Sequence, residues 1–117
     1  VVDDDEVVRS SVRGMLTELG YRVSTAADGA EGLAAIERRE GELDLVILDV
    51  VMPRIDGLEV LRRLRAAGSS VRVVLVSGYW TEARDREADE LAVAGFLRKP
   101  FGFPELAGCV ADALKRA

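Results

Sequence analysis

The sequence predicts an α/β domain, a doubly wound sheet of five parallel strands with helices on both faces. Short apolar runs alternate with helical patterns from one end of the 117 residues to the other. The runs at 43–48 and 71–76 are almost continuously apolar, which is typical of strands that are covered on both faces. Strict alternation of strands with helices favours parallel strands that are joined by helical crossovers.

Local patterns give the expected elements in order. We expect strands at 1–2, 21–25, 43–48, 71–76 and 94–97, and helices at 8–19, 28–37, 58–68, 81–92 and 104–114. Apolar residues recur at steps of three and four in the first helix, which Gly20 ends. Residues 21–25 alternate like a strand, and Asp28 with Glu31 matches a capping box for the second helix. Each element therefore has its own local signal.

The second half of the chain follows the same plan. Residues 52–57 form a turn-rich loop before the third helix, and the highly charged segment at 81–92 predicts a more exposed fourth helix. Pro104 suits the first position of the last helix. No linker or repeat interrupts residues 1–117, so we expect a single domain. Only Val1 and Val2 precede Asp3, whereas a strand usually has about 5 residues; we therefore expect an incomplete first strand within a longer protein.

Composition excludes several functions. The net charge of −5, with no basic stripe, argues against direct nucleic-acid binding. No apolar run approaches the roughly 20 residues of a membrane span, so no membrane contact is expected. The chain has no histidine, which removes histidine triads and histidine metal sites. Cys109 is the single cysteine, so an internal disulfide is impossible and a cytoplasmic location is expected.

Polar side chains stand at the ends of four predicted strands. Asp3 and Asp4 follow the first strand, and the strand 43–48 runs directly into Asp49. Ser77 follows the next strand, and Lys99 follows the last one. Because ligands of open parallel sheets bind outside the carboxyl ends of the strands, these groups are expected to meet. Asp49 is the natural nucleophile among them.

The acids have two interpretations. One of Asp3, Asp4 and Asp5 is suited to cap the first helix, with its neighbours complementing the helix dipole. A cap does not explain Asp49 at the end of another strand. Carboxylates that lie close together repel each other, and a hard cation such as Mg²⁺, which takes oxygen ligands, relieves that repulsion. The set of acids therefore favours a Mg²⁺ site over caps alone.

Together these residues resemble the receiver domain of bacterial two-component response regulators. The motifs that carry the resemblance are Val1–Asp5, Leu48–Pro53, Asp56-Gly57, Val76–Gly78 and Lys99–Phe101. The resemblance covers essentially the whole chain. It implies a flavodoxin-like (βα)5 fold with the strand order 2-1-3-4-5.

The resemblance implies that Asp49 accepts a phosphoryl group from a phosphohistidine. Asp4, Asp49 and the backbone carbonyl of Val51 would bind Mg²⁺, with Asp3 supporting the ion indirectly. Lys99 would contact a phosphoryl oxygen as a point charge. The partner would be a sensor histidine kinase or a phosphotransfer domain. The domain would promote its own phosphorylation and slow dephosphorylation, as a signalling module and not as an enzyme.

The resemblance also implies a switch. Ser77 would turn toward the phosphoryl group, and position 96 would move inward, altering the face made by the fourth helix, the fifth strand and the last helix. That face would be a possible homodimer contact. Position 96 is Phe, where many members have Tyr. Phe has no hydroxyl, so the inward and outward positions of this side chain cannot be distinguished by a hydrogen bond. Val51 and Tyr79 flank the expected path of the hydrolytic water, and their bulk predicts slow loss of the phosphoryl group.

Two other functions remain as alternatives. The first is a Mg²⁺-dependent phosphatase with an aspartyl nucleophile, but Val51 stands where such an enzyme has its acid catalyst. The second is a receiver-like interaction module that is not phosphorylated. The segments Val76–Tyr79 and Gly95–Phe101 look like those of receivers fused to hybrid sensor kinases, in which the kinase lies elsewhere in the polypeptide. Free-standing receivers and receivers with DNA-binding outputs share most of the pattern.

Overall fold

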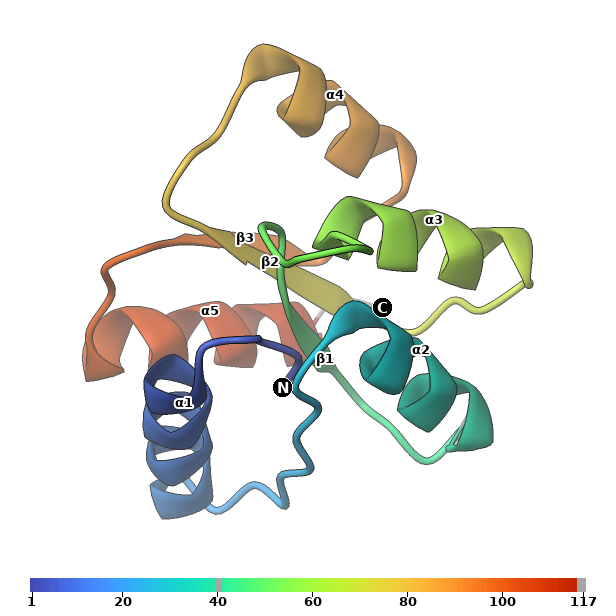
Figure 1. The fold of residues 1–117 in the computed structure, drawn as a ribbon. Coiled ribbons are helices and arrows are strands. Elements are labelled where there is room, and N and C mark those ends of the chain that lie inside the picture. Colours follow the sequence, from blue (N-terminus) through green and yellow to red (C-terminus); the bar gives the residue numbers. More distant parts are fainter. Residues whose placement is uncertain (40, 116–117) are drawn as a thin grey trace.

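The computed structural model describes residues 1–39 and 41–115, which contain five helices and a three-stranded parallel sheet (Figure 1). The helices are α1 (Glu6–Glu18), α2 (Gly29–Arg38), α3 (Gly57–Ala66), α4 (Glu82–Glu90) and α5 (Phe103–Lys115). The strands are β1 (Val46–Asp49), β2 (Val73–Ser77) and β3 (Gly95–Arg98), and they lie in the order β1-β2-β3. No helix in the described part of the chain is long and apolar enough to cross a membrane.

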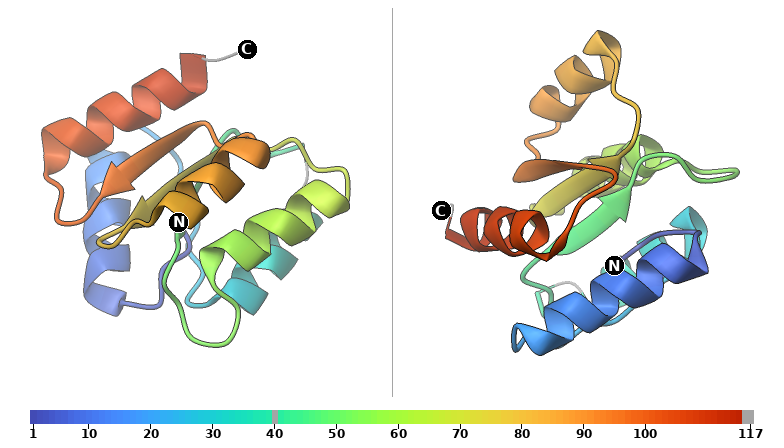
Figure 2. Two further views of the ribbon diagram at one scale, coloured as in Figure 1. Left: turned by 90° about the horizontal axis from the view of Figure 1, so that it is seen from above. Right: turned by 90° about the vertical axis from the view of Figure 1, so that its left-hand side faces the viewer.

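Helices cover both faces of the sheet, as Figure 2 shows from two further directions. Successive strand residues point to opposite faces, so each strand contributes to two cores. Leu48 and Leu75 belong to the core that includes residues of α2, α3 and α4. Ile47 and Val74 belong to the core that includes residues of α1 and α5. The continuously apolar strands of the sequence are thus buried on both sides, as expected.

Val2 lies between two other backbone segments. It forms a parallel bridge with Ala26 on one side and with Leu48 of β1 on the other. Backbone segments therefore lie side by side in the order Ala26, Val2, β1, β2, β3. In terms of the five strands expected from the sequence this is the order 2-1-3-4-5, and that prediction is confirmed.

The prediction of a strand at residues 21–25 is wrong. In the described part of the chain, the Ser24 carbonyl accepts a hydrogen bond from the Val1 ammonium at 2.9 Å, and a single bridge with Val2 follows at Ala26, but residues 21–25 form no ladder. A parallel ladder needs a neighbouring strand along its length, and within the described residues only Val1 and Val2 lie beside this region. Beyond Val1 a groove of about 860 Å³ lies between residues 20–26 and 42–47. The three assigned strands begin one to three residues later than expected and end one residue later.

Helix caps agree with the sequence. Asp28 accepts a hydrogen bond from the amide of Glu31 at 2.8 Å, and the Glu31 carboxylate accepts one from the amide of Ala27 at 3.3 Å. This is a capping-box arrangement, with the return bond one residue before the cap. Gly20, which follows α1, has a φ of 96°, a conformation that glycine adopts without strain.

Candidate functional site

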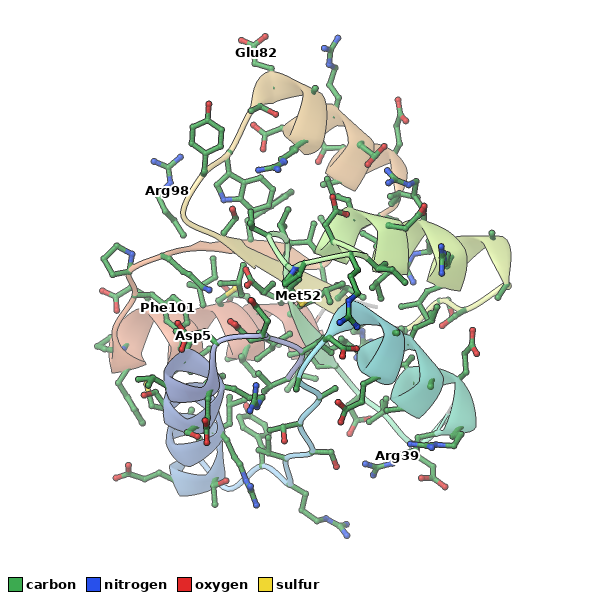
Figure 3. All side chains as sticks on the ribbon, in the orientation of Figure 1. Asp5, Arg39, Met52, Glu82, Arg98 and Phe101 are labelled. Carbon is green, nitrogen blue, oxygen red and sulfur yellow. The ribbon has the colours of Figure 1, made fainter. Side chains whose placement is uncertain are left out.

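The carboxyl ends of the strands bring the predicted polar residues to one edge of the sheet. Asp49 ends β1, Ser77 ends β2, and Lys99 directly follows β3. The amide of Lys99 donates to the carbonyl of Ser77 at 3.0 Å, so the last two strands stay in register up to this edge. Figure 3 marks Asp5 and Met52 in the segments that surround it.

Three carboxylates gather at this edge. Asp3, Asp4 and Asp49 each offer an oxygen, and these oxygens lie within 4.8 Å of one another. Asp3 and Asp49 are only 3% and 5% exposed, whereas Asp4 is exposed. Three acidic oxygen donors at this spacing, one of them open to solvent, fit a hard divalent cation that keeps some of its water.

Asp5, and not Asp3 or Asp4, caps the first helix. The Asp5 carboxylate accepts hydrogen bonds from the amides of Val7 and Val8 at 2.9 and 3.1 Å. The helix cap is therefore accounted for without the other two acids. Asp3 is held in place by the amide of Asp5, which donates to its carboxylate at 2.9 Å.

Lys99 lies between the two buried acids. Its ammonium is 3.2 Å from the Asp3 carboxylate and 3.4 Å from that of Asp49, and its side chain is 26% exposed. Burial acts to lower the pKa of Lys99, but the charges of Asp49 and Asp3 outweigh it and raise the pKa above its ordinary value. Lys99 therefore stays charged, and its single ammonium pairs with both the Asp3 and the Asp49 carboxylates.

The surroundings of Asp49 disfavour its charged form. Burial, followed by repulsion from Asp3, raises its pKa from 3.8 to about 6, although Lys99 opposes the shift. A further positive charge beside Asp49 would relieve this cost. The electrostatics therefore favour the binding of a cation.

The loop after Asp49 is held by backbone contacts. The amide of Gly57 donates to the carbonyl of Val50 at 2.8 Å, and Asp56 caps α3 through the amide of Glu59 at 2.9 Å. A Cβ at position 57 would lie 2.2 Å from the Asp49 carbonyl oxygen. Only glycine allows α3 to begin so close to the end of β1.

Ser77 does not contact the acids in this structure. Its hydroxyl donates to the carbonyl of Tyr79 at 2.9 Å and accepts from the amide of Tyr79 at 3.1 Å. Phe96 is 42% exposed and packs edge-on against Trp80, with ring centroids 5.1 Å apart. Val51 and Tyr79, at 55% and 69% exposed, stand at the surface. The acids and Lys99 are thus assembled, whereas both expected switch residues point elsewhere.

Two arginines next to the site were not predicted. Arg9 donates from Nη1 to the carbonyl of Asp3 at 2.9 Å, and Arg84 donates from Nη1 to the carbonyl of Tyr79 at 3.0 Å. Arg84 is three residues after Thr81, whose hydroxyl accepts from the Arg84 amide and caps α4. Thr81 is a preferred type of N-cap residue. Recognising it as the cap would have placed Arg84 in the first turn of α4, beside the loop that precedes the helix.

Comparisons with known proteins agree with this arrangement. The model of the response regulator receiver domain family matches residues 1–111. Sensor kinase CckA of Brucella abortus (strain 2308) is 40% identical over 116 residues, which cover 99% of this chain and 12% of that protein. Response regulator MprA of Mycobacterium sp. (strain KMS) is 40% identical over 121 residues, which cover 99% of this chain and 50% of that protein. The chain thus spans half or less of these relatives.

A solved structure shows the same fold. Chemotaxis protein CheY4 of Vibrio cholerae is 29% identical, with a TM-score of 0.87, and the match covers 96% of this chain and 93% of that one. The family match, the relatives and the fold all point the same way. The chain belongs to the response regulator receiver domain family, whose members are phosphorelay signalling modules.

Proposed function

We propose that Asp49 is the phosphoryl acceptor of this domain. The observation that carries the proposal is the single ammonium of Lys99 between two buried carboxylates, 3.2 Å from Asp3 and 3.4 Å from Asp49. Asp49 ends a buried strand, so its carboxylate is held by a rigid element. A fixed carboxylate beside a fixed cation is suited to accept a phosphoryl group and to balance its charge.

The donor is the phosphohistidine of a sensor histidine kinase or a phosphotransfer domain. A carboxylate oxygen of Asp49 attacks the phosphorus, a P–O bond forms, and the P–N bond to the imidazole breaks with its electron pair returning to nitrogen. Lys99 then exchanges its contact with the Asp49 oxygen for one with a phosphoryl oxygen. Asp3 keeps Lys99 in position during this exchange, because its own contact with the ammonium does not depend on Asp49.

Asp4 and Asp49, with the backbone carbonyl of Val51, are the proposed ligands of Mg²⁺, and Asp3 supports the ion indirectly. When bound, the ion supplies positive charge that offsets the charge on the phosphoryl oxygens. The donor set fits this ion because all the offered atoms are hard oxygens and Asp4 leaves the site open to water. The raised pKa of Asp49 also favours cation binding, because a nearby cation lowers the free-energy cost of ionising this carboxyl group.

The response to phosphorylation begins at Ser77. Its hydroxyl leaves Tyr79 and donates to a phosphoryl oxygen, and Phe96 turns inward from its partly exposed position. These movements change the face formed by α4, β3 and α5, which is the proposed surface for a homodimer or for another protein partner. A local charge event thereby biases an element that has two states.

The chain stores the phosphoryl group and does not turn over a substrate. Val51, two residues after Asp49, has no acidic group to protonate a leaving alcohol, which an aspartyl phosphatase requires. Incubation with a generic phosphate ester and Mg²⁺ is expected to release no phosphate beyond the buffer rate. Sustained release would favour the phosphatase.

The test is mass spectrometry after incubation with acetyl phosphate and Mg²⁺. We expect the wild type to gain the mass of one phosphoryl group and the Asp49→Asn variant to gain none, and chelation of Mg²⁺ to prevent the gain. Equal labelling of both proteins would contradict the assignment of Asp49. A wild type that never gains mass would support the module that is not phosphorylated.

A further inference from the structure

One loop holds both of the residues that the proposed switch must move. Tyr79 contributes the backbone groups that bind the Ser77 hydroxyl, and Trp80 contributes the ring that packs against Phe96. These two residues are adjacent in the sequence. A change in the position of the loop therefore acts on Ser77 and on Phe96 together.

The Tyr79 carbonyl has a second donor in the present conformation. The Ser77 hydroxyl donates to it at 2.9 Å, and Arg84 Nη1 donates to it at 3.0 Å. The Ser77 hydroxyl has a single proton, so it cannot donate to this carbonyl and to a phosphoryl oxygen at once. Arg84 fixes the Tyr79 carbonyl at a position where the Ser77 hydroxyl can donate to it. This contact favours the unphosphorylated arrangement.

The backbone of Arg84 is also held in place. Its amide donates to the Thr81 hydroxyl at 3.1 Å, at the start of α4. Farther along the helix, Glu87 accepts from Arg62 of α3 at 2.6 Å. Within α4 only Ala88 is buried, so polar contacts of this kind hold the helix more than apolar packing does. The helix is therefore well placed to follow the loop when the loop moves.

From these contacts we infer that Arg84 is a positioning residue that latches the Gly78–Thr81 loop in the resting state and restrains phosphorylation of the domain. The inference rests on the proposed function of Asp49. Arg84 touches neither the acids nor Lys99 through any described contact, so it acts through Tyr79 and Ser77. Removing its guanidinium releases the carbonyl to water, and the hydroxyl leaves at a lower cost.

The test compares Arg84→Gln with Arg86→Gln, which removes the same charge from an exposed position of the same helix. Arg84→Lys keeps the charge and a donor. Acetyl phosphate with Mg²⁺ is the probe, and the rate of mass gain is the first readout. We expect Arg84→Gln to be phosphorylated about two- to five-fold faster than the wild type, as suits one partly exposed charged hydrogen bond. Arg86→Gln should match the wild type, and Arg84→Lys should lie between.

The second readout is the fluorescence of Trp80, the chain's one tryptophan. Before phosphorylation, the emission of Arg84→Gln should already be shifted toward that of the phosphorylated wild type, an effect that a merely structural role would not produce. Rates and emission equal to those of Arg86→Gln, or slower phosphorylation, would overturn the latch while leaving the role of Asp49 intact. A wild type that takes up no phosphoryl group would refute the proposed function and the latch together.

Discussion

The two ends of the sheet differ in how completely they are built. At the carboxyl end, Asp3, Asp49 and Lys99 are buried or partly buried and paired with one another. At the amino end, beside Val1, the sheet opens into a groove of about 860 Å³. The polar edge takes its geometry from the strand ends and from the loops that follow them. It is therefore formed although Val2 joins Ala26 and β1 only through isolated bridges in the described part of the chain.

Loss of Lys99 is expected to have the largest effect, because within the described residues it is the cation that contacts the carboxylates of both buried acids. Lys99→Met should slow phosphorylation by acetyl phosphate about 100-fold, the size of effect seen when one preorganised charge-stabilising group is removed. The rate of mass gain measures it. Lys115→Met, at an exposed position of α5, is the matched control and should behave like the wild type. A Lys99→Met rate within two-fold of the control would show that Lys99 does not assist the transfer of the phosphoryl group to Asp49.

The domain should become more stable when the groove beside Val1 is filled. We expect an apolar extension added before Val1 to continue its strand between residues 21–25 and 43–47, where the Val1 ammonium already donates to the Ser24 carbonyl at 2.9 Å. Burial lowers the pKa of that ammonium to about 6, and a peptide bond would replace it without charge. A Val-Ile-Val extension should stabilise the domain by about 2 kcal/mol after the entropy of ordering is subtracted.

Thermal unfolding measures this gain, and a Ser-Gly-Ser extension of the same length is the control. Both extensions replace the Val1 amino group with a peptide bond, but only the apolar one fills the groove. We expect the Tm to rise by at least about 4 °C more with the apolar extension, given the size of the domain. Equal shifts from the two extensions would show that the groove does not take a strand.

The pH dependence of stability should differ between wild type and Asp49→Asn when no metal is present. The pKa of Asp49 is raised from 3.8 to about 6 in the fold, so the stability linked to this group is complete below pH 3.8 and is lost as the pH rises through 6. Asp49→Asn avoids that loss. At pH 8 the variant should be more stable by about 1 kcal/mol, and this advantage should shrink toward pH 4.

Urea unfolding in the presence of a chelator measures the difference, with the exposed Asp44→Asn as the control. Addition of Mg²⁺ should stabilise the wild type and erase most of the advantage of Asp49→Asn, since the cation offsets the repulsion between the acids. An advantage that does not change with pH would mean that Asp49 gains no stability from protonation.

The smallest expected effect concerns the lifetime of the phosphoryl group. Val51→Ala reduces the bulk beside the expected path of the hydrolytic water, and we expect dephosphorylation to become about two- to three-fold faster, a change of roughly 0.5 kcal/mol in the barrier. Decay of the phosphorylated mass after removal of acetyl phosphate measures it. Val7→Ala changes another exposed valine, on α1, and should leave the lifetime unchanged. A longer lifetime in Val51→Ala would contradict the proposed shielding.

Much of the fold was predictable because its signals are local. The apolar runs, the Asp28 cap and the Gly20 helix end each depend on a few neighbouring residues, and the structure has them where they were expected. The strand at residues 21–25 was not predictable in the same way. Its alternating pattern is typical of a strand, but strand formation also depends on hydrogen bonds to a neighbouring strand, and within the described residues only Val1 and Val2 lie beside it.

The same distinction applies to the site. The meeting of Asp3, Asp4, Asp49 and Lys99 follows from the rule that parallel strands end at one edge. The sequence could not tell which of Asp3, Asp4 and Asp5 caps α1, because all three are aspartates. The backbone geometry decides for Asp5. The orientation of Ser77 toward Tyr79, and the contact of Arg84 with the same carbonyl, depend on the conformation of one loop. Nothing in the spacing of residues determines that conformation.

Chemical trapping can locate the phosphoryl group among the three neighbouring acids. Borohydride reduces an acyl phosphate to an alcohol, so it converts a phosphorylated aspartate to homoserine, which peptide mapping can locate. After treatment with acetyl phosphate and Mg²⁺, we predict homoserine at position 49 and unchanged aspartate at positions 3 and 4. Homoserine at position 3 or 4, or at none of the three, would contradict the assignment of Asp49 as the acceptor.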